Sequence, residues 1–148
     1  MNTIGNRLRL AYYDASDGPR IMLFGPMDAD ILALQNFFYW LSQGEKSTRL
    51  DEQPFIVTFG DVEITSTCTG TTVQECTDGK AQGLRRIEHD RSHFEWCRTS
   101  EDWDYLAELI DGMADNRNAC HQYLTRYPDE DAIVVVSKGE YSDEIMTG

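Results

Sequence analysis

The sequence predicts an α+β domain of two layers, with a largely antiparallel sheet of about eight strands and two helices packed on one face of that sheet. Two observations support this fold class. Apolar residues recur with the period of a helix in residues 30–43 and 99–116, and shorter segments of alternating apolar and polar residues surround both stretches. The 148 residues suit a single domain over 1–148, in which 69–83 form an irregular loop and 138–148 a loose acidic tail.

Each predicted helix carries an apolar stripe that faces the core. The first helix begins at Asp28 or Asp30 and ends before Gly44, a residue type that is common just after helices. Phe37 and Trp40 widen its apolar surface, so this helix is either deeply buried or offers a surface to a second copy or a ligand. The two stripes are Ile31, Leu34, Phe38 and Leu41 in the first helix and Trp103, Leu106, Ile110 and Met113 in the second.

Four pairs of short segments are predicted to form antiparallel hairpins. In the third pair Glu88 lies opposite His93 and Arg86 opposite Glu95, so that opposite charges meet across the strands. In the last pair, the uninterrupted apolar run predicts a strand in the interior of a sheet. The predicted partners are residues 7–14 with 20–25, 54–59 with 62–67, 84–89 with 92–97, and 121–127 with 132–137.

A weak internal repeat relates the two halves of the chain. At an offset of 72 residues the stripe of the first helix falls on that of the second, and Met22 and Phe24 fall on Phe94 and Trp96. Both halves then have the order hairpin, helix, hairpin. This pattern is compatible with duplication and equally with chance similarity between two amphipathic helices.

The charge balance restricts the classes of partner. The formal net charge is -13 and the isoelectric point is near 4.4, so the surface repels phosphate backbones and we expect no direct nucleic-acid partner. The first ten residues lack the apolar region of a secretory signal, and no apolar run is long enough for a membrane span. We therefore expect no membrane partner and a cytoplasmic location.

No sequence motif supports a cofactor, a metal or a catalytic residue, because the signatures of phosphate-binding loops, serine hydrolases and zinc proteases do not occur. His89, His93 and Cys97 have the spacing of zinc ligands on a helix. In the predicted hairpin, however, the two histidines point to opposite faces of the sheet, which disfavours a shared metal.

The four cysteines form no CxxC pair, and we expect inert or buried thiols. A disulfide between Cys68 and Cys76 is the alternative. The neighbouring Cys120 and His121 could form an activated thiol, although adjacent residues of a strand point apart.

Acidic residues occupy the outward side of the second helix. They recur at helical spacing, and no Lys or Arg lies between residues 99 and 116. Like charges four residues apart destabilise an isolated helix by about 0.2–0.5 kcal/mol per pair, so this arrangement has a local cost. The residues are Asp104, Glu108, Asp111 and Asp115.

This pattern predicts a non-enzymatic protein-interaction protein, an inhibitor or immunity-type factor that masks a basic site on a partner protein. The turn of Asp129, Glu130 and Asp131 extends the surface if the fold brings it near. Without a partner, the acidic side is either a solvated surface or is neutralised by Arg117 and Arg126.

The alternative function is that of a small-ligand protein or an enzyme that uses the open face of the sheet, lined by Arg85, His89 and Trp96. A deep pocket with convergent polar groups favours this alternative, whereas a flat acidic surface favours docking. A homodimer through the helix Ile31–Leu41 or through an edge strand is compatible with both functions.

Overall fold

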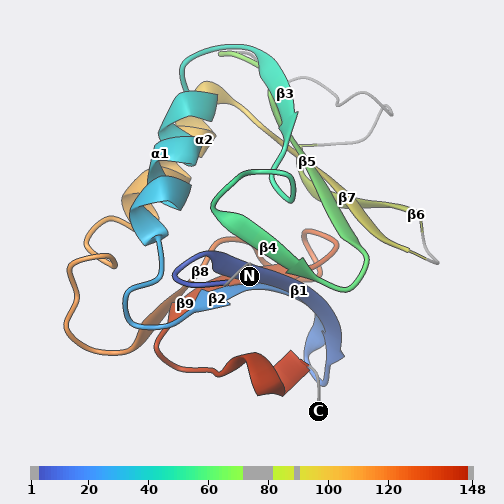
Figure 1. Cartoon of the computed structure of the whole chain (residues 1–148). Coiled ribbons are helices and arrows are strands. Elements are labelled where there is room, and N and C mark those ends of the chain that lie inside the picture. Colours follow the sequence, from blue (N-terminus) through green and yellow to red (C-terminus); the bar gives the residue numbers. More distant parts are fainter. Residues whose placement is uncertain (1–3, 72–81, 89–90, 147–148) are drawn as a thin grey trace.

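The computed structural model describes residues 4–71, 82–88 and 91–146, and these residues form two helices and nine strands (Figure 1). The helices are α1 (Ile31–Leu41) and α2 (Ser100–Leu109), and a short 3-10 helix, η1 (Asp143–Met146), follows the last strand. The strands are β1 (Leu8–Ala15), β2 (Gly18–Gly25), β3 (Lys46–Arg49), β4 (Ile56–Phe59), β5 (Val62–Cys68), β6 (Gly83–Glu88), β7 (Ser92–Arg98), β8 (Cys120–Tyr123) and β9 (Ile133–Lys138).

The strands form two mixed sheets, so the prediction of one largely antiparallel sheet is wrong, whereas the α+β class with two helices is confirmed. The five-stranded sheet has the order β4-β1-β2-β9-β8, and the four-stranded sheet has the order β3-β5-β7-β6. Three pairs are parallel: β1 with β4, β2 with β9, and β5 with β7. Parallel pairing joins segments that are distant in sequence, and alternation of residues does not reveal which distant strand is the neighbour.

Three of the four predicted hairpins are confirmed, namely β1–β2, β6–β7 and β8–β9. The hairpin of residues 54–59 with 62–67 does not form, because β4 lies in the five-stranded sheet and β5 in the four-stranded sheet. Strand β9 lies between β2 and β8, which is the interior position that its apolar run predicts.

The register of β6 and β7 is partly as predicted. Glu88 lies opposite His93, but Glu95 lies opposite Arg85 instead of Arg86. A register shift between Arg86 and Glu88 causes the difference, because an extra residue in one strand displaces all pairs beyond it.

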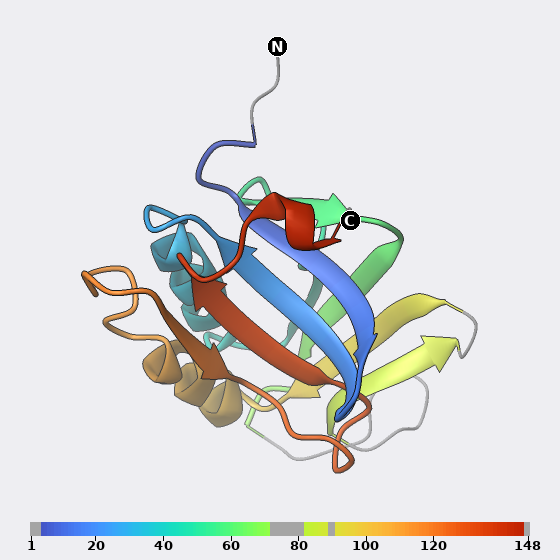
Figure 2. The same ribbon diagram turned by 90° about the horizontal axis from the view of Figure 1, so that it is seen from below.

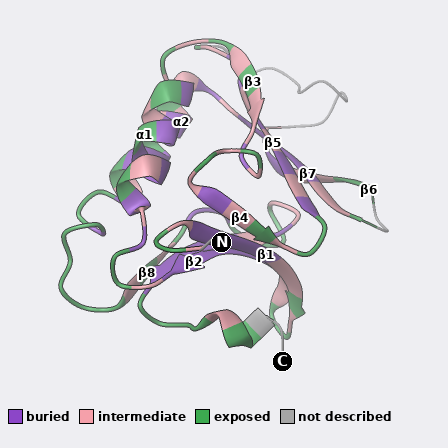
Figure 3. Cartoon of the chain, in the orientation of Figure 1, coloured by how far each residue is buried: buried purple, intermediate pink, exposed green. Residues whose placement is uncertain are grey.

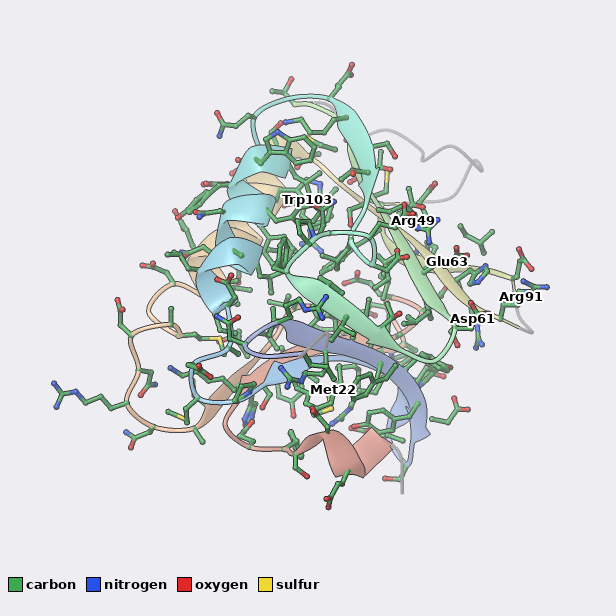
Figure 4. The ribbon with its side chains drawn as sticks, viewed as in Figure 1. Met22, Arg49, Asp61, Glu63, Arg91 and Trp103 are labelled. Carbon is green, nitrogen blue, oxygen red and sulfur yellow. The ribbon has the colours of Figure 1, made fainter. Side chains whose placement is uncertain are left out.

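The larger of two apolar cores fills the space between both sheets and the helix pair, and all eight stripe residues are buried in it (Figure 3). Trp103 of α2 lies near its centre (Figure 4). Its ring stacks on Phe38 with a centroid distance of 5.7 Å and meets Trp96 edge-on at 5.2 Å. Its indole N–H donates to the carbonyl oxygen of Thr67 at 3.0 Å, so that α2 is tied directly to β5.

Helix α2 ends at Leu109, so the predicted helix of residues 99–116 is too long. Thr99 caps its beginning and accepts a hydrogen bond from the backbone N–H of Asp102 at 3.2 Å. Beyond Leu109 the chain turns, and Gly112 has a φ of 85°, a left-handed value that is incompatible with a continuing helix. The stripe residues at the end of the predicted helix reach the core from this turn.

The two halves of the chain have equivalent connectivity, which supports the internal repeat. Each half supplies a hairpin, a helix and a strand pair: β1–β2, α1 and β3–β5 in the first half, and β6–β7, α2 and β8–β9 in the second. In both halves the hairpin joins the strand pair of the other half through a parallel contact. The registers differ by one residue, however. At the offset of 72 residues Ser137 is equivalent to Thr65, but Trp96, the equivalent of Phe24, lies opposite Ser66. Burial agrees with this difference, since Trp96 belongs to the large core and Phe24 to a separate small cluster. The sheets are therefore built by exchange of strand pairs between the halves.

Residues 138–143 contact the rest of the domain, in contrast to the loose tail predicted for residues 138–148, of which residues 147 and 148 lie outside the described part of the chain. Lys138 is the last residue of β9 and is 1% exposed. The N–H of Gly139 donates to the carbonyl oxygen of Gly25 at 2.8 Å. Helix η1 lies on the face of the five-stranded sheet that points away from α1 and α2 (Figures 1 and 2), and there Asp143 pairs with Arg9 at 2.7 Å.

Candidate functional site

Four carboxylates lie on α2 and on the turn that follows it. Two of them are one helical turn apart on α2, and the other two follow the end of the helix. The first is half-buried and the other three are exposed. Within the parts of the chain that the structure describes, none of the four makes an ion pair. We call this set the acidic face: Asp104, Glu108, Asp111 and Asp115.

A buried amide fixes one member of the acidic face. Gln35 of α1 is 6% exposed, and its Nε2 donates to the carboxylate of Asp111 at 2.9 Å and to the carbonyl oxygen of Ala107 at 3.1 Å. Ala107 belongs to the last turn of α2, where carbonyl groups have no partner within the helix. Gln35 therefore caps the end of α2 and orients an exposed carboxylate with the same side chain.

A buried lysine holds the turn that carries the last member of the acidic face. The Nζ atom of Lys138 donates to the carbonyl oxygen of Asn116 at 2.5 Å and to that of Ala114 at 3.3 Å. These two residues flank Asp115 in sequence. Sequence reasoning places Lys138 in the tail and misses this role, because nothing in the pattern reveals that the end of β9 lies under the turn.

The turn of Asp129, Glu130 and Asp131 packs against β6, and two of its three carboxylates accept hydrogen bonds from the backbone of that strand. The carboxylate of Glu130 accepts from the backbone N–H of Leu84 at 2.8 Å, and that of Asp131 accepts from the backbone N–H of Arg86 at 2.8 Å. Asp129 contributes its backbone carbonyl, which accepts from an arginine of β6 at 2.9 Å. The turn thus bonds to the edge of β6, the last strand of its sheet in the part of the chain that the structure describes.

The structure contradicts one of the three residues of the alternative ligand site. Trp96 is completely buried, so it does not line an accessible surface. Arg85 donates to the backbone carbonyl of Asp129 at 2.9 Å and lies 3.7 Å from the carboxylate of Asp131. His89 lies outside the described residues.

One of the described cysteines differs from its predicted state as an inert thiol. Cys68 and Cys120 are free thiols, whereas Cys97 is disulfide-bonded. The alternative disulfide between Cys68 and Cys76 is therefore wrong, and Cys76 itself lies outside the described residues. In residues 4–71, 82–88 and 91–146 no group of three or more His, Cys, Asp or Glu side chains could hold a metal ion.

A charged network covers part of the four-stranded sheet (Figure 4). Arg49 pairs with Asp51 at 2.5 Å and with Glu63 at 2.6 Å, and His93 lies 2.8 Å from Glu63. Burial alone would raise the pKa of Asp51, but hydrogen bonds from Arg49 and from the backbone N–H of Ile64 lower the pKa below its ordinary value. These contacts tie β3, β5 and β7 together.

A cleft of about 420 Å³ opens beside α2, between that helix, β8 and the end of β7. Tyr105 and Leu109, one helical turn apart, form its apolar wall, and Tyr105 is 54% exposed. Two arginines and a glutamate form a second, charged wall. We call this site the arginine cleft: Arg98, Tyr105, Leu109, Gln122, Arg126 and Glu130.

The two arginines of this cleft have few contacts. The side chain of Arg98 is 15% exposed, its buried Nε atom has no hydrogen-bond partner among the described residues, and its nearest carboxylate is that of Glu130 at 4.0 Å. Arg126 is exposed and makes no ion pair within the described structure. Neither Arg126 nor Arg117 neutralises the acidic face. Sequence reasoning misses Arg98 as a site residue. The one feature of the sequence that could have indicated the cleft is Tyr105, an aromatic residue of α2 that lies outside the apolar stripe.

The first helix presents a second, apolar surface. Leu32 and Trp40 are 54% and 49% exposed, and Phe37, Trp40 and Phe55 line a hollow of about 270 Å³. The Nζ atom of Lys46 lies 4.6 Å from the ring centroid of Trp40. The homodimer through α1 stays a prediction, since no second copy is present to test it.

No protein-family model matches the chain, and comparisons with curated proteins and with solved structures give no match. No helix in the described part of the chain is both long and apolar enough to cross a bilayer. Fold and site together define an acidic α+β protein.

Proposed function

We propose that this chain is a non-enzymatic protein-interaction protein, an inhibitor or immunity-type factor whose acidic face covers a basic site on a partner protein. The observation that carries the proposal is a set of four carboxylates without an ion pair in the described residues, on a segment held by Gln35 and Lys138. Carboxylates that are already ordered bind arginine and lysine side chains with a smaller entropic cost than mobile ones.

Local energetics support a role for these charges beyond solvation. Asp104 and Glu108 repel each other at i and i+4, and Glu108 lies in the last turn of α2, where the helix dipole disfavours a negative charge. The last turn of α2 contains no basic residue. A basic partner surface would relieve this repulsion. The free energy that the repulsion costs the free protein is then recovered when the complex forms.

The chemistry of the partner follows from the overall charge. A net charge of -13 attracts cationic proteins over long range and accelerates their association, and it repels nucleic acids and anionic membranes. The partner is therefore a protein with clustered Lys and Arg side chains. Its complex weakens as salt is added, because the Debye length falls from about 10 Å at 0.1 M to about 3 Å at 1 M.

The test is affinity purification from the source organism at low and high salt. Glu108→Lys with Asp115→Lys reverses the acidic face and leaves the Gln35–Asp111 hydrogen bond intact. The control, Asp17→Lys with Asp28→Lys, makes the same charge change at exposed positions elsewhere.

We expect a protein of high isoelectric point to bind the wild type and the control at low salt, to dissociate at high salt, and to be lost with the acidic-face variant. Circular dichroism verifies that both variants are folded. Identical bound proteins for the wild type and the acidic-face variant would remove these carboxylates from the interface and overturn the proposal.

A further inference from the structure

We propose that the arginine cleft binds a small organic anion, whose carboxylate or phosphate group is held by Arg98 and Arg126 while a planar ring lies against Tyr105 and Leu109. This site is separate from protein docking by the acidic face, and the two proposals stand or fall independently. The cleft volume of about 420 Å³ lies within the range of small-molecule pockets, about 300–1,000 Å³.

Arg98 supplies the first argument, because one of its donors is buried without a hydrogen-bond partner among the described residues. A guanidinium group has five N–H donors in a planar fork. In the described structure the Nε of Arg98 is buried without a partner, and the 4.0 Å to Glu130 is too long for a hydrogen bond. Buried donors are usually satisfied, and the planar fork matches the two oxygens of a carboxylate or phosphate.

Glu130 does not neutralise the cleft. Its Oε2 atom accepts from the backbone N–H of Leu84 at 2.8 Å, so this carboxylate already serves the edge of β6. Its single negative charge neutralises at most one of the two arginines, and Arg126 has no ion pair among the described residues. The cleft therefore has an excess of positive charge in a protein whose net charge is -13.

The surrounding charge favours a small ligand over a polyanion. Beyond a Debye length, about 8 Å at physiological ionic strength, the attraction of two arginines is screened. A nucleic acid that reached the cleft would also lie along α2 and meet the carboxylates of Asp104 and Glu108. A small anion makes direct contact with the arginines and avoids that repulsion.

The apolar wall selects for a ring on the ligand. Tyr105 exposes half of its surface although it lies on a helix whose inward stripe is completely buried. Leu109 follows one turn later and extends the wall. An aromatic ring that stacks on Tyr105 buries apolar surface and places an attached anionic group toward the arginines.

The experiment is a two-dimensional amide NMR titration of the isotope-labelled full chain with four probes. Phenyl phosphate and benzoate carry both a ring and a charge, and comparison of the two identifies the preferred head group. Benzyl alcohol has the ring alone, and inorganic phosphate has the charge alone. We expect saturable shifts around Arg98, Tyr105 and Arg126 in the millimolar range for at least one charged ring, with both partial probes binding about tenfold or more weakly.

Two variants and a control make the titration decisive. Arg126→Gln removes an exposed arginine without an ion pair and should weaken binding about tenfold. Arg98→Lys keeps the positive charge and removes the planar pair of N–H donors. The resulting loss of affinity should be largest for benzoate, whose two carboxylate oxygens would both bind that pair. Arg117→Gln makes the same charge change outside the cleft and should leave affinity unchanged. Absence of saturable shifts at the cleft with either charged ring, or equal affinity in the Arg126→Gln and Arg117→Gln variants, would overturn the proposal.

Discussion

The side-chain amide of Gln35 in α1 lies 2.9 Å from the carboxylate of Asp111, and the same nitrogen donates to the carbonyl oxygen of Ala107 at 3.1 Å. One buried side chain thus joins the two helices, satisfies a free carbonyl at the end of α2 and orients a member of the acidic face. This contact links the packing of the core directly to the surface on which the proposed function depends.

Gln35→Leu should therefore destabilise the protein. The substitution leaves the carbonyl of Ala107 without its donor and frees the carboxylate of Asp111, and we expect a loss of about 1–3 kcal/mol in the free energy of unfolding. Chemical denaturation measures the loss. The control is Gln43→Leu. The Nε2 of Gln43 donates to the carbonyl oxygen of Tyr39 at 3.2 Å, but at an exposed position where water can replace it, so this change should alter stability by less than about 0.5 kcal/mol. Equal effects of the two substitutions would contradict the capping role.

Neighbouring acids of the β8–β9 turn should differ in their effect on stability. Glu130 accepts a hydrogen bond from the backbone of β6 through its carboxylate, whereas Asp129 uses its backbone carbonyl. Glu130→Ala leaves the N–H of Leu84 unpaired and should cost about 1–3 kcal/mol, while Asp129→Ala should cost less than about 0.5 kcal/mol. Thermal or urea unfolding of both variants distinguishes them, and a larger loss for Asp129→Ala would show that the turn is held differently.

Local patterns in the sequence predict the helices and hairpins but not the arrangement of the sheets. The apolar stripes and the turns between adjacent strands depend on residues close in sequence, and they are found correctly. The contact of β5 with β7 joins segments about 30 residues apart, and that of β2 with β9 more than 100, so periodicity carries no information about either. The end of α2 is missed because the apolar stripe continues through Met113 after the helix has ended, and Gly112 was the available signal.

The candidate sites show the same limit. Spacing on one helix predicts the outward direction of Asp104 and Glu108, which are separated by one turn. It does not reveal that Glu130 reaches across to the edge of β6, or that Trp96 is covered by the core. The arginine cleft draws its residues from α2, the end of β7 and the segment after β8, and only the three-dimensional fold brings Arg98 and Arg126 to one place.

The Asp51 carboxylate should make stability dependent on pH in the acid range. Although burial raises its pKa, the hydrogen bonds and charge of Arg49 and the N–H of Ile64 lower it below its value in the unfolded chain. The ionised group therefore stabilises the folded state above the unfolded pKa of about 4, and this contribution is lost as the pH falls through the folded pKa.

Urea unfolding of the wild type and of Asp51→Asn, from neutral pH to about pH 2, measures this contribution. We expect the variant to be less stable at neutral pH and the difference between the two proteins to shrink below about pH 4. A difference that stays constant over the whole range would show that the carboxylate titrates alike in both states.

Two tryptophans of the core should respond differently to the same substitution. Trp96 and Trp103 are both completely buried and their rings are in contact, with centroids 5.2 Å apart. The indole N–H of Trp103 donates to the carbonyl of Thr67 at 3.0 Å, whereas the indole N–H of Trp96 has no partner among the described residues. Both changes to Phe remove similar volume, but only Trp103→Phe breaks a hydrogen bond, while Trp96→Phe removes an unsatisfied donor. We expect Trp103→Phe to lower the free energy of unfolding by about 1 kcal/mol more than Trp96→Phe does. If Trp96→Phe caused the larger loss, the indole N–H of Trp96 would have to be paired in solution.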